Sequence, residues 1–122
     1  MRGENSEKYI DLFCQMKKRG LINAATYDAA IGFYVEGENV DMALQKLAEM
    51  NDLGMNPSLT TAQNLVLSVA EQGLPRLAMD LAIAFEGSSL RRIDTETWVK
   101  LLVEFSDNLY VSVFSLMFYG ND

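Results

Sequence analysis

Apolar side chains recur at helical spacing along nearly the whole chain. They follow one another at intervals of three and four residues, as in the runs Tyr9, Leu12, Phe13, Met16 and Ala43, Leu47, Met50. This spacing places them on one face of an α-helix, and no stretch alternates strictly between apolar and polar residues as a half-buried strand does. The pattern therefore predicts an all-α protein.

Glycine, proline and short polar residues divide the pattern into segments. Glycine accepts the left-handed conformation just past a helix end, and proline fits a first helical turn. We expect helices to stop at Gly20, Gly37, Gly54 with Pro57, Gly73 with Pro75, and Gly87. Candidate caps for the following helices are Thr26, Asn39, Thr60 or Thr61, Asp94 or Thr95, and Asp107 or Asn108. These signals predict seven helices, near residues 7–19, 25–36, 39–53, 60–72, 75–86, 95–106 and 108–119.

The same arrangement of residues returns along the chain. The trio Met16, Gly20, Asn23 is followed 34 residues later by Met50, Gly54, Pro57. Steps of 35 and 36 residues then relate apolar positions in sets: Ala30, Leu65, Leu101; Ile31, Val66, Leu102; Tyr34, Val69, Phe105; Ala43, Ala78, Phe114; and Leu47, Ala82, Phe118. One helical hairpin cannot hide its own apolar face, so such repeats stack on their neighbours. We expect an α-α superhelix of stacked antiparallel hairpins, with about three repeats.

Composition is that of one folded domain. The chain has 122 residues, of which 49% are hydrophobic and 22% charged, which is enough apolar material for a core. Its longest nearly apolar stretch, residues 110–119, is far shorter than the roughly 20 residues that span a bilayer. The single cysteine, Cys14, excludes an internal disulfide and is expected to be a packed or half-exposed thiol. A net charge of −7 argues against strong electrostatic attraction to nucleic acid or anionic membranes.

The residues offer little for catalysis. With no histidine and one cysteine, the chain lacks a metal cluster, a Ser-His pair and a Cys-His pair. Acidic pairs such as Glu36 with Glu38, or Asp94 with Glu96, fall at predicted helix ends, where carboxylates serve the helix dipole. We therefore expect no enzymatic activity, no cofactor and no small-molecule substrate. An enzyme remains conceivable only with a catalytic domain outside these residues.

The stretch ATYDAAIGFYVEGENVDMALQKLAEMNDLGMNPS, residues 25–58, resembles one copy of the pentatricopeptide repeat. That family has an aromatic-led first helix ending near a glycine, then a second helix with an early alanine, a late methionine and a Gly-x-x-Pro stop. Residues 7–24 resemble a preceding second helix, and residues 60–94 and 96–119 resemble degenerate copies. The tetratricopeptide repeat has the same period, but it would need other residues where Ile31 and Met55 stand. The resemblance implies a right-handed solenoid.

The resemblance also implies a function and the residues that would carry it. Members of the family usually bind single-stranded RNA in mitochondria or chloroplasts, with one repeat reading one base. By position, the base-reading candidates are Asp28 with Ser58, Gln63 with Asp94 or Ile93, and Val99. The family prefers Asn, Thr or Ser in the first slot and Asp or Asn in the last, and only the second of these copies comes near that pattern.

Charge departs from the family pattern at the ends of the first helices. Where the family commonly carries Lys or Arg, this chain has Glu36, Glu71 and Asp107. These carboxylates would either repel phosphates or lie in solvent without a role.

Basic residues form two small sets. Lys17, Lys18 and Arg19 stand at a predicted helix C-terminus, where cations complement the dipole. Arg91 and Arg92 follow a predicted turn, where they would pair with Asp94 and Glu96. Both sets are also candidates for contact with phosphate or with an acidic partner.

The last predicted helix is apolar nearly all round, which is unusual for a helix that faces solvent. Its partner-facing candidates are Tyr110, Phe114, Phe118 and Tyr119. Together with the unpaired second helix at the start, this predicts a fragment of a longer protein or a subunit covered by others. We expect a non-catalytic scaffold or docking module in organellar gene-expression machinery, in a chloroplast or mitochondrion, away from membranes. The alternative is a sequence-specific protein for single-stranded RNA in organellar RNA processing.

Overall fold

The computed structural model describes the backbone of residues 2–89 and 92–118 and the side chains of residues 7–88 and 92–106. These ranges contain six helices and no strand: α1 (Arg2–Lys18), α2 (Ala24–Glu36), α3 (Val40–Asp52), α4 (Leu59–Glu71), α5 (Pro75–Ser89) and α6 (Thr95–Phe118). The prediction of an all-α protein is confirmed. The chain forms two compact units, residues 1–57 and residues 58–122, and each is described by itself.

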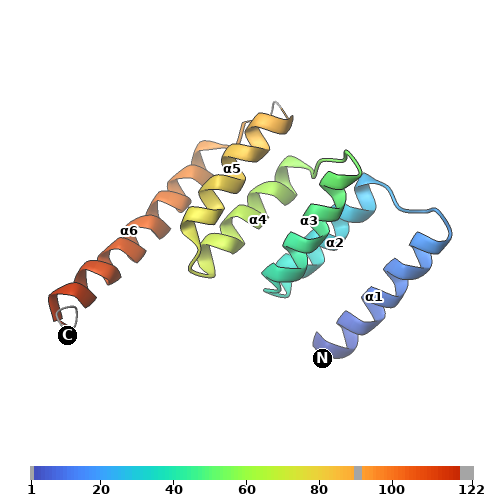
Figure 1. The fold of residues 1–122 in the computed structure, drawn as a ribbon, viewed down its shortest axis with the longest axis horizontal. Coiled ribbons are helices and arrows are strands. Elements are labelled where there is room, and N and C mark those ends of the chain that lie inside the picture. Colours follow the sequence, from blue (N-terminus) through green and yellow to red (C-terminus); the bar gives the residue numbers. More distant parts are fainter. Residues whose placement is uncertain (1, 90–91, 119–122) are drawn as a thin grey trace. The chain divides into compact units, whose positions relative to one another are not determined.

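The core of the first unit is a hairpin. Helices α2 and α3 run antiparallel and are joined by residues 37–39 (Figure 1). Helix α2 contributes buried Tyr27, Ala30, Ile31 and Tyr34, and α3 contributes buried Val40, Ala43, Leu47 and Met50. Ala43 is wholly buried, as expected where two helices approach closely.

Aromatic side chains connect α1 to this hairpin. The Phe13 ring meets Tyr27 edge-on at 5.4 Å between centroids, and Tyr9 stacks on Phe33 at 4.0 Å. From α3, the Lys46 ammonium lies 4.3 Å from the centre of the Phe13 ring, a cation–π contact. These contacts bury Phe13 against the hairpin.

The second unit repeats the hairpin and adds a helix. Helices α4 and α5 run antiparallel, joined by residues 72–74, and α6 packs against both (Figure 1). The buried apolar residues are Ala62, Leu65, Val66, Val69 and Ala70 on α4, Ala78, Ala82 and Phe85 on α5, Ile93 before α6 and Leu101 within it.

The recurring Met-x-x-x-Gly pattern marks one type of helix ending. The Leu21 N–H donates to the Met16 carbonyl at 2.9 Å, and the Met55 N–H donates to the Met50 carbonyl at 3.0 Å. Between them, Gly20 and Gly54 hold positive φ angles of 68° and 74°. This is the Schellman ending, in which a glycine in the left-handed conformation closes the last turn. The predicted stops at these two glycines are confirmed.

Helices α2, α4 and α6 begin with the same type of cap. The side-chain oxygens of Asn23, Ser58 and Asp94 accept the N–H groups of Thr26, Thr61 and Thr97, at 3.0, 3.2 and 2.9 Å. The expected caps Asn39 and Asp94 are confirmed. Thr26 and Thr61 instead take the third helical position, since Asn23 and Ser58 stand before α2 and α4 with extended backbones suited to a cap.

The end of α2 differs from the prediction in one detail. The helix stops at Glu36, as expected, but Gly37 has φ −81° and Glu38 takes the left-handed conformation with φ 58°. The Asn39 N–H then closes the turn on the Tyr34 carbonyl at 2.8 Å. Closure of the hairpin therefore places the left-handed conformation at Glu38, although glycine at position 37 would adopt it at lower cost.

Two further predicted boundaries are wrong. Helix α5 continues through Gly87 to Ser89, and the predicted helices 95–106 and 108–119 form one helix, α6. A single glycine inside a helix costs only about 1 kcal/mol. Asp107 and Asn108 are residue types that often cap a helix, but neither glycine nor proline stands near them to end the preceding helix. The described residues therefore contain six helices rather than seven.

Candidate functional site

The structure brings one predicted pair of base-reading residues together. The Oε1 atom of Gln63, on α4, accepts the backbone N–H of Asp94 at 2.8 Å. The Oδ1 atom of Asp94 in turn accepts the Thr97 N–H at the start of α6. Gln63 therefore connects α4 to the beginning of α6. The side chains of Gln63 and Asp94 both already take part in hydrogen bonds within the fold.

The Asp94 carboxylate is stabilised in its charged form. Its pKa is lowered from the usual value, first by the hydrogen bond from the Thr97 backbone and then by the Thr97 side chain, with a further contribution from Gln63. Asp94 is exposed, so this charge remains accessible to solvent.

Ile93, the alternative to Asp94, belongs to the core of the second unit. Its side chain is only 5% exposed, and its N–H donates to Glu86 Oε2 at 2.9 Å. Of the two candidates, Asp94 is therefore the one whose side chain is exposed.

The other predicted pair, Asp28 with Ser58, falls in different units. Asp28 is half-buried on α2 in the first unit, whereas Ser58 caps α4 in the second. The Ser58 hydroxyl accepts the Thr61 N–H, so capping of α4 explains why a serine stands there.

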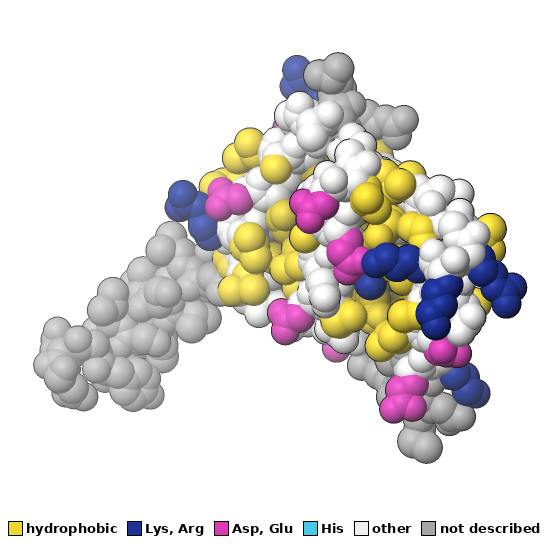
Figure 2. Space-filling view, turned by 45° about the vertical axis from the view of Figure 1, so that its right-hand side comes forward, with side chains coloured by type: hydrophobic (Ala, Val, Ile, Leu, Met, Phe, Trp, Pro, Cys, Tyr) yellow, Lys and Arg dark blue, Asp and Glu magenta, His cyan; other side chains and the backbone are white. Residues whose placement is uncertain are grey.

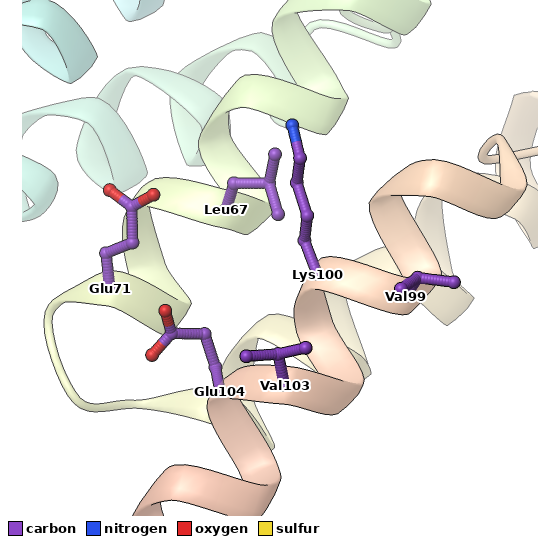
Figure 3. A pocket seen from close by; sticks show the side chains of 6 residues that line it. All are labelled: Leu67, Glu71, Val99, Lys100, Val103 and Glu104. Atoms are coloured by element: carbon purple, nitrogen blue, oxygen red, sulfur yellow. The ribbon is translucent and has the colours of Figure 1, made fainter.

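Val99, the last base-reading candidate, lines a hollow in the second unit. This hollow has a volume of about 180 Å³ and lies between α4 and α6 (Figure 3). Its lining residues are Leu67 and Glu71 from α4, and Val99, Lys100, Val103 and Glu104 from α6.

The charges around this hollow are mainly negative. The Glu71 and Glu104 carboxylates lie on one side of it, and the Lys100 ammonium points away from them (Figure 3). Lys100 pairs with Glu96 at 3.4 Å. Glu71 is one of the three acidic residues that stand where the resemblance leads us to expect basic ones. Of the others, Glu36 is exposed at the end of α2, and the side chain of Asp107 lies outside the described residues.

Helix geometry accounts for the first basic set. Lys17 and Lys18 occupy the last turn of α1, and Arg19 belongs to the glycine-terminated ending that follows. All three are exposed. In the second set, Arg92 is exposed and Arg91 lies outside the described residues.

The predicted partner-facing residues fall where no side chains are described. Helix α6 includes Tyr110, Phe114 and Phe118, but its side chains are described only as far as residue 106. Tyr119 lies outside the described residues altogether.

Exposed apolar side chains do occur earlier on the same helix. Val99, Leu102 and Val103 are 52%, 65% and 52% exposed. Space filling shows other apolar side chains at the surface among charged ones (Figure 2). The sequence held a signal for Leu102, since Ile31 and Val66 occupy the same repeat slot and are both 0% exposed. The repeat pattern identifies this slot but does not predict whether its last copy is covered by a neighbouring helix.

Groups suited to metal or redox chemistry do not gather in the described part of the chain. No cluster of three His, Cys, Asp or Glu residues there has the geometry for a metal ion. Cys14 is exposed and not disulfide-bonded, more open than the packed or half-exposed thiol expected. Within the same residues, no helix combines the length and apolar character needed to cross a bilayer.

The chain matches no protein-family model, no curated protein and no solved structure.

Proposed function

We propose that this chain is a non-catalytic docking module of the pentatricopeptide type, serving as a subunit of organellar gene-expression machinery. The observation that carries the proposal is the recurrence of one cap, a side-chain oxygen accepting the N–H of a threonine three residues on. It occurs at Asn23, Ser58 and Asp94, at steps of 35 and 36 residues. We further propose that the hairpins continue as a right-handed solenoid, the arrangement that such a period favours.

Exposed apolar surface supports docking as the role. Leu102 is 65% exposed in a repeat slot whose two earlier members, Ile31 and Val66, are fully buried. Adjacent apolar side chains in solvent are typical of surfaces that another protein covers. Val99 and Val103 extend the same exposed surface along α6.

Recognition of single-stranded RNA is the second candidate function. It is favoured by the contact between Gln63 and Asp94, the two positions that the resemblance gives to one base. Charge opposes it, since Glu36 and Glu71 stand where basic residues would meet phosphates, and the net charge is −7. We therefore place docking first.

Titration with labelled single-stranded RNA at two salt concentrations separates the two functions. A docking module is expected to bind weakly at both, without base preference. Tight binding that falls steeply with salt and depends on base identity would overturn the docking proposal in favour of RNA recognition.

The location and partners are proposed from the family resemblance. We expect the chain to act in a chloroplast or mitochondrion and to copurify with other protein subunits rather than with membranes. Mass spectrometry of a tagged chain recovered from isolated organelles tests this. Recovery with cytosolic complexes alone would contradict the organellar assignment.

A further inference from the structure

We propose that the hollow between α4 and α6 binds a basic, apolar segment of a partner protein. A lysine or arginine of the partner would lie at the Glu71 and Glu104 carboxylates, and an adjacent Leu, Ile or Val would rest on Leu67 and Val103. This inference rests on the proposed docking function and specifies the chemistry of the partner.

The apolar part of the hollow has room for a side chain. Leu67 comes from α4, whereas Val99 and Val103 come from consecutive turns of α6 and are each 52% exposed. The volume is about 180 Å³, and an apolar cavity of about 150 Å³ is enough to accept benzene. Covering these three side chains would remove apolar surface from water, which favours binding.

Charge selects a cation at the other part of the hollow. The Glu71 and Glu104 carboxylates lie near each other, while the Lys100 ammonium is directed away and pairs with Glu96 (Figure 3). Opposite charges across an interface favour the correct partner, and like charges exclude wrong ones. A lysine or arginine therefore fits beside these carboxylates, whereas a phosphate does not.

A second copy of the chain fits the hollow less well. Each copy carries a net charge of −7, so two copies repel each other overall. The occupant we propose is therefore a different protein, basic where this chain is acidic.

Selection from a random peptide library tests the proposal with the full chain as bait. The double variant Glu71→Gln with Glu104→Gln serves for counter-selection, since it keeps side-chain size and removes both charges. The matched control is Glu36→Gln with Asp52→Asn, which removes two exposed charges from the first unit. Fluorescence anisotropy then gives the affinity of each selected peptide for the chain and for both variants.

The expected peptides carry Lys or Arg next to Leu, Ile or Val. Their affinity should fall about tenfold or more in the Glu71 and Glu104 double variant and also in Val103→Ser, because each removes one half of the site. In the control variant the affinity should change less than about twofold, as for charges outside an interface. Circular dichroism should show the same helix content for all variants.

Three results would overturn the inference: no selected peptides, peptides without basic residues, or peptides whose binding the double variant leaves unchanged. Binding of single-stranded RNA that Val103→Ser abolishes, or dimerisation seen by sedimentation and lost in that variant, would also overturn it. Failure of this site leaves the docking function standing if partner subunits still copurify, because they would then bind another surface. If the docking function itself is wrong, we expect the RNA titration to show base-specific binding instead.

Discussion

Glu38 holds a backbone conformation that suits glycine better than glutamate. Its φ of 58° lies in the left-handed region, which otherwise contains Gly20, Gly54 and Gly73 among the described residues. A side chain in this region meets its own backbone, at a cost of roughly 1–2 kcal/mol. Gly37, one position earlier, does not need the freedom that glycine gives, since its φ is −81°.

Glu38→Gly is therefore expected to stabilise the first unit. Relief of the left-handed strain should raise the free energy of unfolding by about 1 kcal/mol, partly offset by the greater freedom of glycine in the unfolded chain. Urea unfolding followed by circular dichroism measures the change. Gly37→Ala is the control, because a Cβ there meets only ordinary contacts at 3.6 Å or more. A loss of stability in Glu38→Gly would show that the side chain of Glu38 matters more than its backbone strain.

The tyrosines of the first unit predict how stability depends on alkaline pH. Burial raises the pKa of Tyr9, Tyr27 and Tyr34 above the ordinary value of 10.0, with a further rise at Tyr27 from Glu49. Above pH 10.0 the unfolded chain releases these protons before the folded chain does, so stability falls as pH rises through the folded pKa values. Below that pH the contribution is fully present.

Ultraviolet absorbance of tyrosinate during a pH titration checks this expectation. We expect ionisation of these rings to begin above the pH at which it begins in urea-unfolded chain. Tyr27→Phe keeps the ring and removes one titrating group, so it should lessen the alkaline loss of stability. Coincident titration curves for folded and unfolded chain would contradict the proposed burial.

At the scale of the element, helix ends explain most of the boundaries. Asn23 and Thr26 satisfy each other's backbone N–H groups, at 3.0 and 3.3 Å, in a capping box at the start of α2. Such a cap fixes the first turn and sets the register of the apolar face that follows.

Asn23→Ala is expected to destabilise the first unit by about 1 kcal/mol, the usual cost of losing a capping side chain. Asn23→Asp keeps an acceptor oxygen and adds a charge that suits the helix N-terminus, so it should retain stability. Chemical unfolding of both variants measures the difference. Equal losses in both would mean that the amide of Asn23, rather than its acceptor oxygen, is required.

Gly87→Ala provides the complementary test inside a helix. Gly87 lies within α5, and a Cβ added there meets nothing within 4 Å. Alanine should raise the stability of the second unit by up to about 1 kcal/mol through its better helix propensity. A loss of stability on the same substitution would indicate that α5 ends at Gly87, as the sequence alone suggested.

At the scale of the whole molecule, the sequence predicted the recurring buried positions better than the helix boundaries. The positions Ala30, Leu65 and Leu101 recur because each side chain is buried in the core of its unit, and that requirement is visible in the spacing of apolar residues. The resemblance paired Gln63 with Asp94 as base readers, but it did not predict that the Gln63 side chain accepts the Asp94 backbone N–H, because this bond joins residues 31 apart with all of α5 between them. The sequence does not predict the continuity of α6, because Asp107 and Asn108 have the chemistry of helix caps although no residue before them ends a helix.

One repeat slot tests whether the second unit offers a surface for a partner. Ile31 is 0% exposed and Leu102 is 65% exposed, although the repeat gives them the same position. Ile31→Ala should therefore lower the free energy of unfolding by about 2–5 kcal/mol, whereas Leu102→Ala should change it by less than about 0.5 kcal/mol. Urea unfolding of the two variants measures both, and the copurified subunits should be lost only with Leu102→Ala. If Leu102→Ala costs as much as Ile31→Ala, then Leu102 is already covered in the free chain, and the exposed slot cannot be the surface that a partner occupies.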